Sequence, residues 1–334
     1  MLLFVSNQLA VISESDIVKY RLAGMLAILI GGLTSGYLAS SRFRVSENLA
    51  KKLMTFVLVF FNWQIALLVI WEMQLSRQLI WLPVTGLVLM LYATFLSVLI
   101  FSFLKIDQRS RLTLILAGAL SNTGYTGGAF VCYAIFGTLG LAMANIYHVL
   151  SIPTFYFIYL PLLKFREVKN KDSAAKFKFS DLLDPRMLAI PAIMGALFLN
   201  LTDVKAPFFI SRLHIIDVFV YVASFLSFFS IGLRVKFSRL RNYKKLYFMV
   251  GAVKFILIPI AALLIIWILA LTGHNLTDLV QKVIIVLSAA PCAIVMVTMS
   301  NVFDLDGPLA SAVWVVITAG FALIVVPVLF FVFA

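Results

Sequence analysis

Ten long apolar stretches limit what this chain can fold into. They cover approximately residues 18–40, 50–71, 79–104, 112–136, 139–163, 187–202, 210–233, 245–271, 280–302 and 309–333. A helix needs about 20 apolar residues to cross a bilayer, and continuous apolar runs favour helices over a transmembrane barrel. Because 63% of the residues are hydrophobic and only 12% are charged, the chain is much more apolar than a soluble domain. The sequence therefore predicts an all-α polytopic membrane protein with ten transmembrane helices.

The basic residues gather in alternate loops. Of the 27 Lys and Arg residues, 20 lie in the first, third, fifth and seventh loops, whereas the even-numbered loops hold Arg77, Lys205 and Arg212. Cytoplasmic loops of membrane proteins are enriched in Lys and Arg. We therefore expect a protein of the cell membrane (inner or plasma membrane) with both termini on the non-cytoplasmic side. The net charge of +13 then reflects orientation in the lipid bilayer, and no nucleic acid is expected as a partner.

Two short motifs recur about half a chain apart. The sequence MLAI at residues 25–28 recurs at 187–190, a shift of 162, and GLA at 140–142 corresponds to PLA at 308–310, a shift of 168. Since five helices are an odd number, the second half would enter the membrane from the opposite side, as in many secondary transporters. We therefore expect a first five-helix repeat, a basic cytoplasmic linker and a second, inverted five-helix repeat, at residues 1–164, 165–186 and 187–334.

The fourth and ninth apolar stretches are both interrupted near their middle. Residues 121–128 read SNTGYTGG, and residues 288–292 read SAAPC. Proline and glycine weaken a helix, and unpaired backbone groups in hydrocarbon cost several kcal/mol, so such breaks persist where they face protein or a wet cavity. Interrupted helices at corresponding positions of two halves are typical of a midplane binding site, and we expect the two breaks to cross. The alternative is that the glycines only allow close helix packing.

Broken helices expose the positive ends of half-helices, which attract carboxylates. A lysine in the middle of a span costs about 2.5–3.5 kcal/mol on insertion scales, so Lys254 should face a partner or an aqueous path, or else extend to the interface. His148 could bind substrate, relay a proton or form a structural hydrogen bond. The candidate substrate-binding residues are Asn122, Thr123, Gly124, Thr126, Gly127, Pro291 and Cys292 in the breaks, with Asn62, His148 and Lys254 in other spans.

Several classes of chemistry lack their motifs in this chain. There is no Walker A glycine-rich loop, no HExxH motif and no cluster of cysteines and histidines with metal-ligand spacing. The two cysteines, Cys132 and Cys292, both lie within apolar runs and predict no disulfide framework. We therefore expect neither an enzyme nor a cofactor, and no metal site.

Five motifs spread over the whole chain have counterparts in one family of membrane carriers. They are Gly36-Tyr37-Leu38, Asn122-Thr123-Gly124-Tyr125-Thr126-Gly127, Gly140-Leu141-Ala142 with Tyr147, Lys254 with Pro259, and Ala290-Pro291. Together they resemble the auxin efflux carrier family of bacterial permeases and plant auxin carriers, within the superfamily of bile acid, arsenite and riboflavin transporters. This chain departs from the family at Gly128, where a proline is usual, at His148, where an acidic residue is common, and at Cys292, where a second proline is common.

The resemblance implies a fold and a function. It implies that spans four and nine cross within a mobile transport domain formed by spans three to five and eight to ten. Spans one, two, six and seven would form a scaffold and hold a homodimer together. Family substrates are carboxylates, so the resemblance implies a small organic anion such as a carboxylate or an auxin-like weak acid.

We therefore predict a secondary active transporter of an organic anion that works by alternating access at the crossing, with a proton or sodium as the coupling ion. One alternative is a sodium-coupled symporter that resembles the bile acid:sodium symporters, in which Ser121, Thr123 and Thr126 would supply oxygen ligands. Another alternative is a sensor or channel without turnover.

Overall fold

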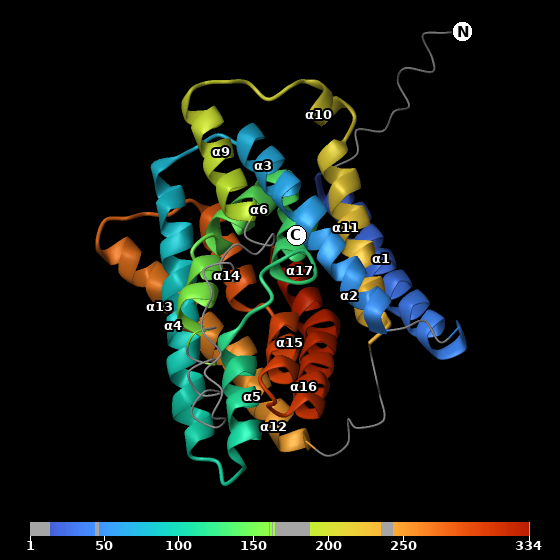
Figure 1. Cartoon of the computed structure of the whole chain (residues 1–334). Coiled ribbons are helices and arrows are strands. Elements are labelled where there is room, and N and C mark those ends of the chain that lie inside the picture. Colours follow the sequence, from blue (N-terminus) through green and yellow to red (C-terminus); the bar gives the residue numbers. More distant parts are fainter. Residues whose placement is uncertain are drawn as a thin grey trace.

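The computed structural model describes residues 14–43, 47–159, 161, 163, 188–234 and 243–333 (Figure 1). These residues form helices joined by turns, and no strand occurs among them. Seven helical segments within the described ranges are long and apolar enough to cross a membrane. The prediction of an all-α membrane protein is thus confirmed. The predicted linker, residues 165–186, lies outside the described residues.

In the first half of the chain, several helices are built from shorter pieces that follow one another. The elements are α1 (Glu14–Phe43), α2 (Glu47–Phe56), the π-helical η1 (Val57–Phe61), α3 (Asn62–Glu72), the short η2 (Arg77–Ile80), α4 (Trp81–Ser102), α5 (Gln108–Ala119), α6 (Gly128–His148), α7 (Ser151–Thr154) and the π-helical η3 (Phe155–Tyr159).

The second half contains two further π-helical segments and a second interrupted helix. Its elements are α9 (Ala189–Leu201), α10 (Phe209–Arg212), α11 (Ile215–Gly232), α12 (Lys244–Ala252), the π-helical η7 (Val253–Leu257), α13 (Ile258–Leu271), α14 (Asp278–Ser288), α15 (Ile294–Val302), α16 (Gly307–Gly320), the π-helical η8 (Phe321–Val325) and α17 (Val326–Phe333). Helix α9 corresponds to the sixth apolar stretch and is the shortest of the ten predicted spans, with 13 residues.

Helix α6 reverses direction at Gly137. This residue has φ 68° and ψ −155°, a conformation that glycine adopts without strain. Residues eight apart in a straight helix are separated by about 12 Å, yet a Cβ on Gly140 would lie 2.6 Å from the carbonyl oxygen of Cys132. The chain therefore folds back, and residues 128–136 and 138–148 form two arms. The predicted boundary between the fourth and fifth stretches, at residues 136–139, coincides with this turn.

The helices pack into two groups, which Figure 1 shows side by side. Helices α1, α2, α3, α9 and α11 contact one another, and α4, α5, α7 and α12 to α17 contact one another. Helix α6 packs against α4 and α14 in the second group, and it also contacts α1, α3 and α11 in the first. The most extensive contacts between the groups therefore involve α6. We call the two sets the α1 group and the α4 group, with α6 in the latter.

Within the α1 group, helices α1 and α11 touch through their backbones. A Cβ on Gly36 would lie 2.2 Å from the carbonyl oxygen of Phe229, and a Cβ on Gly232 would lie 2.3 Å from that of Leu33. Such small residues let membrane helices approach closely and gain van der Waals contact. The pair α1 and α11 is therefore a tightly packed unit.

Replacing Gly36 by alanine should push α1 away from α11. Because the added methyl group meets backbone rather than a movable side chain, we expect a loss of about 1–3 kcal/mol of stability, which is typical of overpacking. Gly31→Ala is the matched control, since no atom lies within 4 Å of the added methyl group. Thermal unfolding in detergent, followed by size-exclusion chromatography, measures both; equal midpoints for the two variants would contradict the close contact.

Candidate functional site

The two interrupted segments meet. Helices α5 and α6 are separated by residues 120–127, and helices α14 and α15 by residues 289–293. The backbone amide of Asn122 donates to the carbonyl oxygen of Pro291 at 2.7 Å, and the amide of Ala293 donates to that of Leu120 at 3.0 Å. The predicted breaks in both stretches, and their contact with each other, are therefore present.

These two hydrogen bonds form an isolated antiparallel bridge that pairs Ser121 with Cys292. The side chain of Lys254 reaches this bridge from η7, where its Nζ donates to Ser121 Oγ at 2.9 Å. The Cys292 thiol lies close enough to interact electrostatically with the ammonium group. Lys254 and Cys292, two of the predicted site residues, thus come together at the crossing, whereas Ser121 was expected only as a sodium ligand.

Lys254 is fully buried, with 0% of its surface exposed, so it does not extend to the membrane interface. Within the described part of the chain, no carboxylate forms an ion pair with it, and the Ser121 hydroxyl is its hydrogen-bond partner. An ammonium group can donate three hydrogen bonds. Lys254 is therefore a buried cation without a counter-charge, which is costly in a membrane protein.

The helix that carries Lys254 is locally widened. Residues Val253–Leu257 are π-helical, and the amide of Ile258 donates to the carbonyl oxygen of Val253, five residues earlier. Such single π-helical turns occur frequently at functional sites. The sequence of η7 contains no glycine or proline, so nothing in it signals this feature.

His148 joins the same break from the end of α6. Its Nδ1 lies 2.8 Å from Thr123 Oγ1, at hydrogen-bonding distance. The turn at Gly137 makes this contact possible, because it brings the second arm of α6 back alongside the break. The structure thus brings together two predicted site residues that lie 25 positions apart.

Asn122 and Thr126 form hydrogen bonds with each other. Asn122 Nδ2 donates to Thr126 Oγ1 at 3.0 Å, and Thr126 Oγ1 lies 3.3 Å from Asn122 Oδ1. Gly127 lies against them: a Cβ there would be 2.0 Å from the carbonyl oxygen of Asn122, whereas a Cβ on Gly124 would be 3.9 Å from its nearest neighbour, Asn122 Oδ1. These side chains therefore stabilise the shape of the break, and Gly127 is required sterically where Gly124 is not.

The two half-helices that follow the breaks differ at their N-termini. The amides of Gly128 and Ala129, at the start of α6, donate to the carbonyl oxygens of Asn122 and Thr123 at 2.9 and 3.1 Å. The expectation that this end offers free amides to an anion is therefore wrong. In α15, the amides of Ile294 and Val295 have no hydrogen-bond partner among the described residues, and both residues are partly exposed. The open positive end is that of α15, directly after Cys292.

On the side facing the α1 group, Tyr125 makes contacts that the sequence did not indicate. Its hydroxyl donates to Asn145 Oδ1 at 3.1 Å and lies 3.5 Å from the backbone carbonyl oxygen of Asn62, while its own carbonyl oxygen accepts from Ser224 Oγ at 3.1 Å. Asn62 thus approaches the break through its backbone, whereas its side chain was the predicted group. Asn145 could have been found, because it lies three residues before His148 and shares its helix face.

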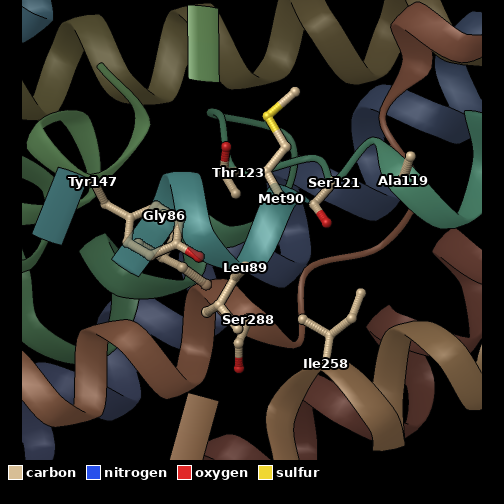
Figure 2. A pocket seen from close by; sticks show the side chains of 10 residues that line it. Gly86, Leu89, Met90, Ala119, Ser121, Thr123, Tyr147, Ile258 and Ser288 are labelled. Atoms are coloured by element: carbon tan, nitrogen blue, oxygen red, sulfur yellow. The ribbon is translucent and has the colours of Figure 1, made fainter. Parts of the chain in front are cut away.

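A small cavity of about 30 Å³ lies beside the α5–α6 break (Figure 2). Ser121 and Thr123 line it from the break, Tyr147 from α6, Ile258 from α13 and Ser288 from α14. A water molecule needs about 10–15 Å³ of such space, whereas organic ligands occupy pockets of about 300 Å³ or more. The cavity therefore has room for about two water molecules, and an organic ligand requires the surrounding helices to move apart.

No protein-family model matches the chain, and no curated protein sequence is significantly similar to it. The functional argument therefore rests on the site itself. At the crossing the structure combines a buried, uncompensated ammonium group, an unoccupied helix N-terminus and a hydroxyl-rich break. Chemically, this arrangement can accept a negatively charged group.

Proposed function

We propose that the protein is a secondary transporter of a small organic anion and works by alternating access at the crossing of its two interrupted helices. The observation that carries this proposal is Lys254, which is fully buried and has a hydroxyl group as its partner in place of a carboxylate. A buried charge in a membrane protein is stabilised by an opposite charge, and mid-membrane charges generally mark substrate or ion pathways. An anionic substrate would supply the missing charge.

The start of α15 supports the same conclusion. The free amides of Ile294 and Val295 follow directly after the residues that contact Ser121 and Lys254. A helix N-terminus carries about half a positive charge and binds carboxylates and phosphates. A carboxylate between Lys254 and this helix end would receive both hydrogen bonds and charge compensation.

Two features support the inverted five-plus-five repeat. A shift of 171 residues exchanges the two hydrogen bonds of the crossing, since Asn122 then replaces Ala293 and Leu120 replaces Pro291. The π-helical segments η3 and η8 begin at Phe155 and Phe321, 166 residues apart. Both shifts agree with the sequence shifts of 162 and 168. We infer ten transmembrane helices, with α5–α6 and α14–α15 as the broken fourth and ninth.

The two helix groups support a division into a scaffold and a transport domain. The α1 group corresponds to spans one, two, six and seven, and the α4 group to spans three to five and eight to ten. Polar contacts between the groups include a hydrogen bond from Tyr133 Oη to Asp217 Oδ1 at 2.5 Å. We infer that the α4 group moves relative to the α1 group, which would form the homodimer, as the resemblance to auxin efflux carriers implies. We place both termini on the non-cytoplasmic side of a cell membrane.

The environment of Ser121 favours this proposal over a sodium-coupled symporter. The Ser121 hydroxyl, expected in that alternative to coordinate sodium, accepts a hydrogen bond from the Lys254 ammonium group. Two cations a few ångströms apart in a low-dielectric site repel each other strongly. The fixed charge of Lys254 thus takes the position that sodium would need.

Counterflow in proteoliposomes tests the proposal. Vesicles containing the purified protein and loaded with an unlabelled carboxylate should take up the same labelled carboxylate transiently above equilibrium, and protein-free vesicles should not. Mono- and dicarboxylates are compared in sodium-containing and sodium-free buffer, with equal uptake expected in both. A channel would equilibrate the label without overshoot, and a sensor would take up none; either result across the carboxylate panel would contradict the proposal.

A further inference from the structure

A second and larger cavity lies between the two helix groups, far from any residue discussed above for the crossing. It is a groove of about 450 Å³, lined mainly by Leu33 and Tyr37 of α1, Phe228 of α11, Trp314 and Thr318 of α16, and Leu323 of η8. One wall therefore belongs to the α1 group and the other to the α4 group. Binding pockets in proteins typically have this size and often lie between domains or between the helices of a bundle.

The groove is open toward the hydrocarbon of the bilayer. Two residues of its lining, Leu38 on α1 and Leu323 on η8, have 56% and 77% of their surfaces exposed. Both belong to segments that are long and apolar enough to span the membrane. In a bilayer such residues face acyl chains, so a lipid chain can enter the groove from the side.

Two polar groups interrupt the otherwise apolar wall. The indole Nε1 of Trp314 and the hydroxyl of Thr318 are buried, and neither has a hydrogen-bond partner. The two residues lie one helical turn apart and therefore share the face of α16 that lines the groove. A buried donor without an acceptor costs about 1–3 kcal/mol by protein mutational data, so a ligand that brings an acceptor would be favoured.

We propose that this groove binds one acyl chain of a membrane lipid, with the lipid's ester carbonyl oxygen accepting a hydrogen bond from Trp314 or Thr318. The apolar walls suit the chain, and the two unpaired donors suit the carbonyl group. Trp314 lies about 10 Å along α16 from Gly307. Gly307 follows the loop in which the exposed ion pair between Arg109 and Asp304 marks the aqueous side. A carbonyl group at the upper end of an acyl chain lies at a comparable distance from water.

The bound chain would connect the two helix groups. The α1 and α11 wall is held by the backbone contacts at Gly36 and Gly232, whereas Trp314 and Thr318 belong to the opposite group. Relative movement of the groups would therefore change the width of the groove. We expect the lipid to bind best to the arrangement seen here.

Photo-crosslinking tests the proposal without a transport assay. The purified full chain is reconstituted with a trace of a phospholipid that carries a diazirine on its acyl chain, irradiated, digested and analysed by mass spectrometry. We expect labelling concentrated on the groove residues of α1, α11 and α16, and a decrease when unlabelled phospholipid is added in detergent. Labelling spread evenly over all lipid-facing helices would overturn the proposal.

Two variants separate the parts of the proposal. Ala319, which lines the groove, is replaced by phenylalanine to fill it, and we expect groove labelling to fall at least tenfold. Trp314→Phe keeps an aromatic wall and removes the indole donor, and it should reduce labelling several-fold. Trp267→Phe is the matched control, because Trp267 is 60% exposed on α13, and labelling should not change. Unchanged labelling in Ala319→Phe would refute the groove, and unchanged labelling in Trp314→Phe together with Thr318→Val would refute the carbonyl contact.

Discussion

Replacing Lys254 by methionine should abolish uptake of the anion and leave the protein folded. Methionine has a similar length and is apolar, so it fills the same buried space without the cost of a buried charge. Removing one member of a buried, hydrogen-bonded charge pair typically costs about 2–5 kcal/mol. Uptake should therefore fall by about 30-fold to about 4,000-fold. Initial rates of labelled carboxylate uptake in proteoliposomes, at equal protein content, measure the effect.

Lys282→Met is the matched control for this experiment. It removes the same charge from the α4 group, but Lys282 is partly exposed and pairs with Asp278 on the surface of α14 at 2.7 Å. Such exposed pairs contribute about 0–1 kcal/mol, so uptake should stay close to that of the unmodified protein. If Lys254→Met transports as well as Lys282→Met, the buried ammonium group does not bind the substrate.

Alanine at Gly127 should damage the crossing, whereas alanine at Gly124 should not. The methyl group at position 127 would lie 2.0 Å from the carbonyl oxygen of Asn122, and that oxygen also accepts the amide of Gly128. Because backbone has to move and a hydrogen bond is then strained, we expect Gly127→Ala to cost about 3 kcal/mol or more. The methyl group at position 124 meets its nearest atom at 3.9 Å, so that variant should stay within about 1 kcal/mol.

Thermal unfolding of both glycine variants in detergent gives the comparison. Gly127→Ala should unfold at a clearly lower temperature than Gly124→Ala and the unmodified protein. Its uptake activity should be lost as well, because the break would no longer hold Thr123 and Ser121 in position. The same unfolding temperature for both variants would mean that the break has another shape in the membrane.

The sequence predicted the helical class and the two breaks because their signals are local. Glycines, a proline and hydroxyl-bearing residues within apolar runs are visible in any window of 20 residues. The prediction that Asn122, Thr123 and His148 lie near the crossing also followed from their positions within spans four and five. The count of ten helices and the inverted repeat remain inferences, although the hydrogen bonds at Asn122 and Ala293 support them.

Contacts between distant residues could not be predicted from the sequence. Ser121 and Lys254 are 133 positions apart, and nothing in the apolar pattern indicates that one donates a hydrogen bond to the other. The π-helical turn that carries Lys254 has no compositional signal either. Likewise, periodicity treats the starts of α6 and α15 as equivalent, whereas carbonyl oxygens of the preceding loop occupy only the first.

The pairing of the two breaks is made by main-chain atoms alone. Amide and carbonyl groups of Asn122, Pro291, Ala293 and Leu120 form both hydrogen bonds, so their side chains are free to vary in identity. Proline is the one residue that cannot stand at 122 or 293, because it lacks the amide hydrogen. Distant homologues could therefore retain this junction while sharing almost no residues with it. Their kinship would be recognisable from backbone coordinates and from two positions that never hold proline.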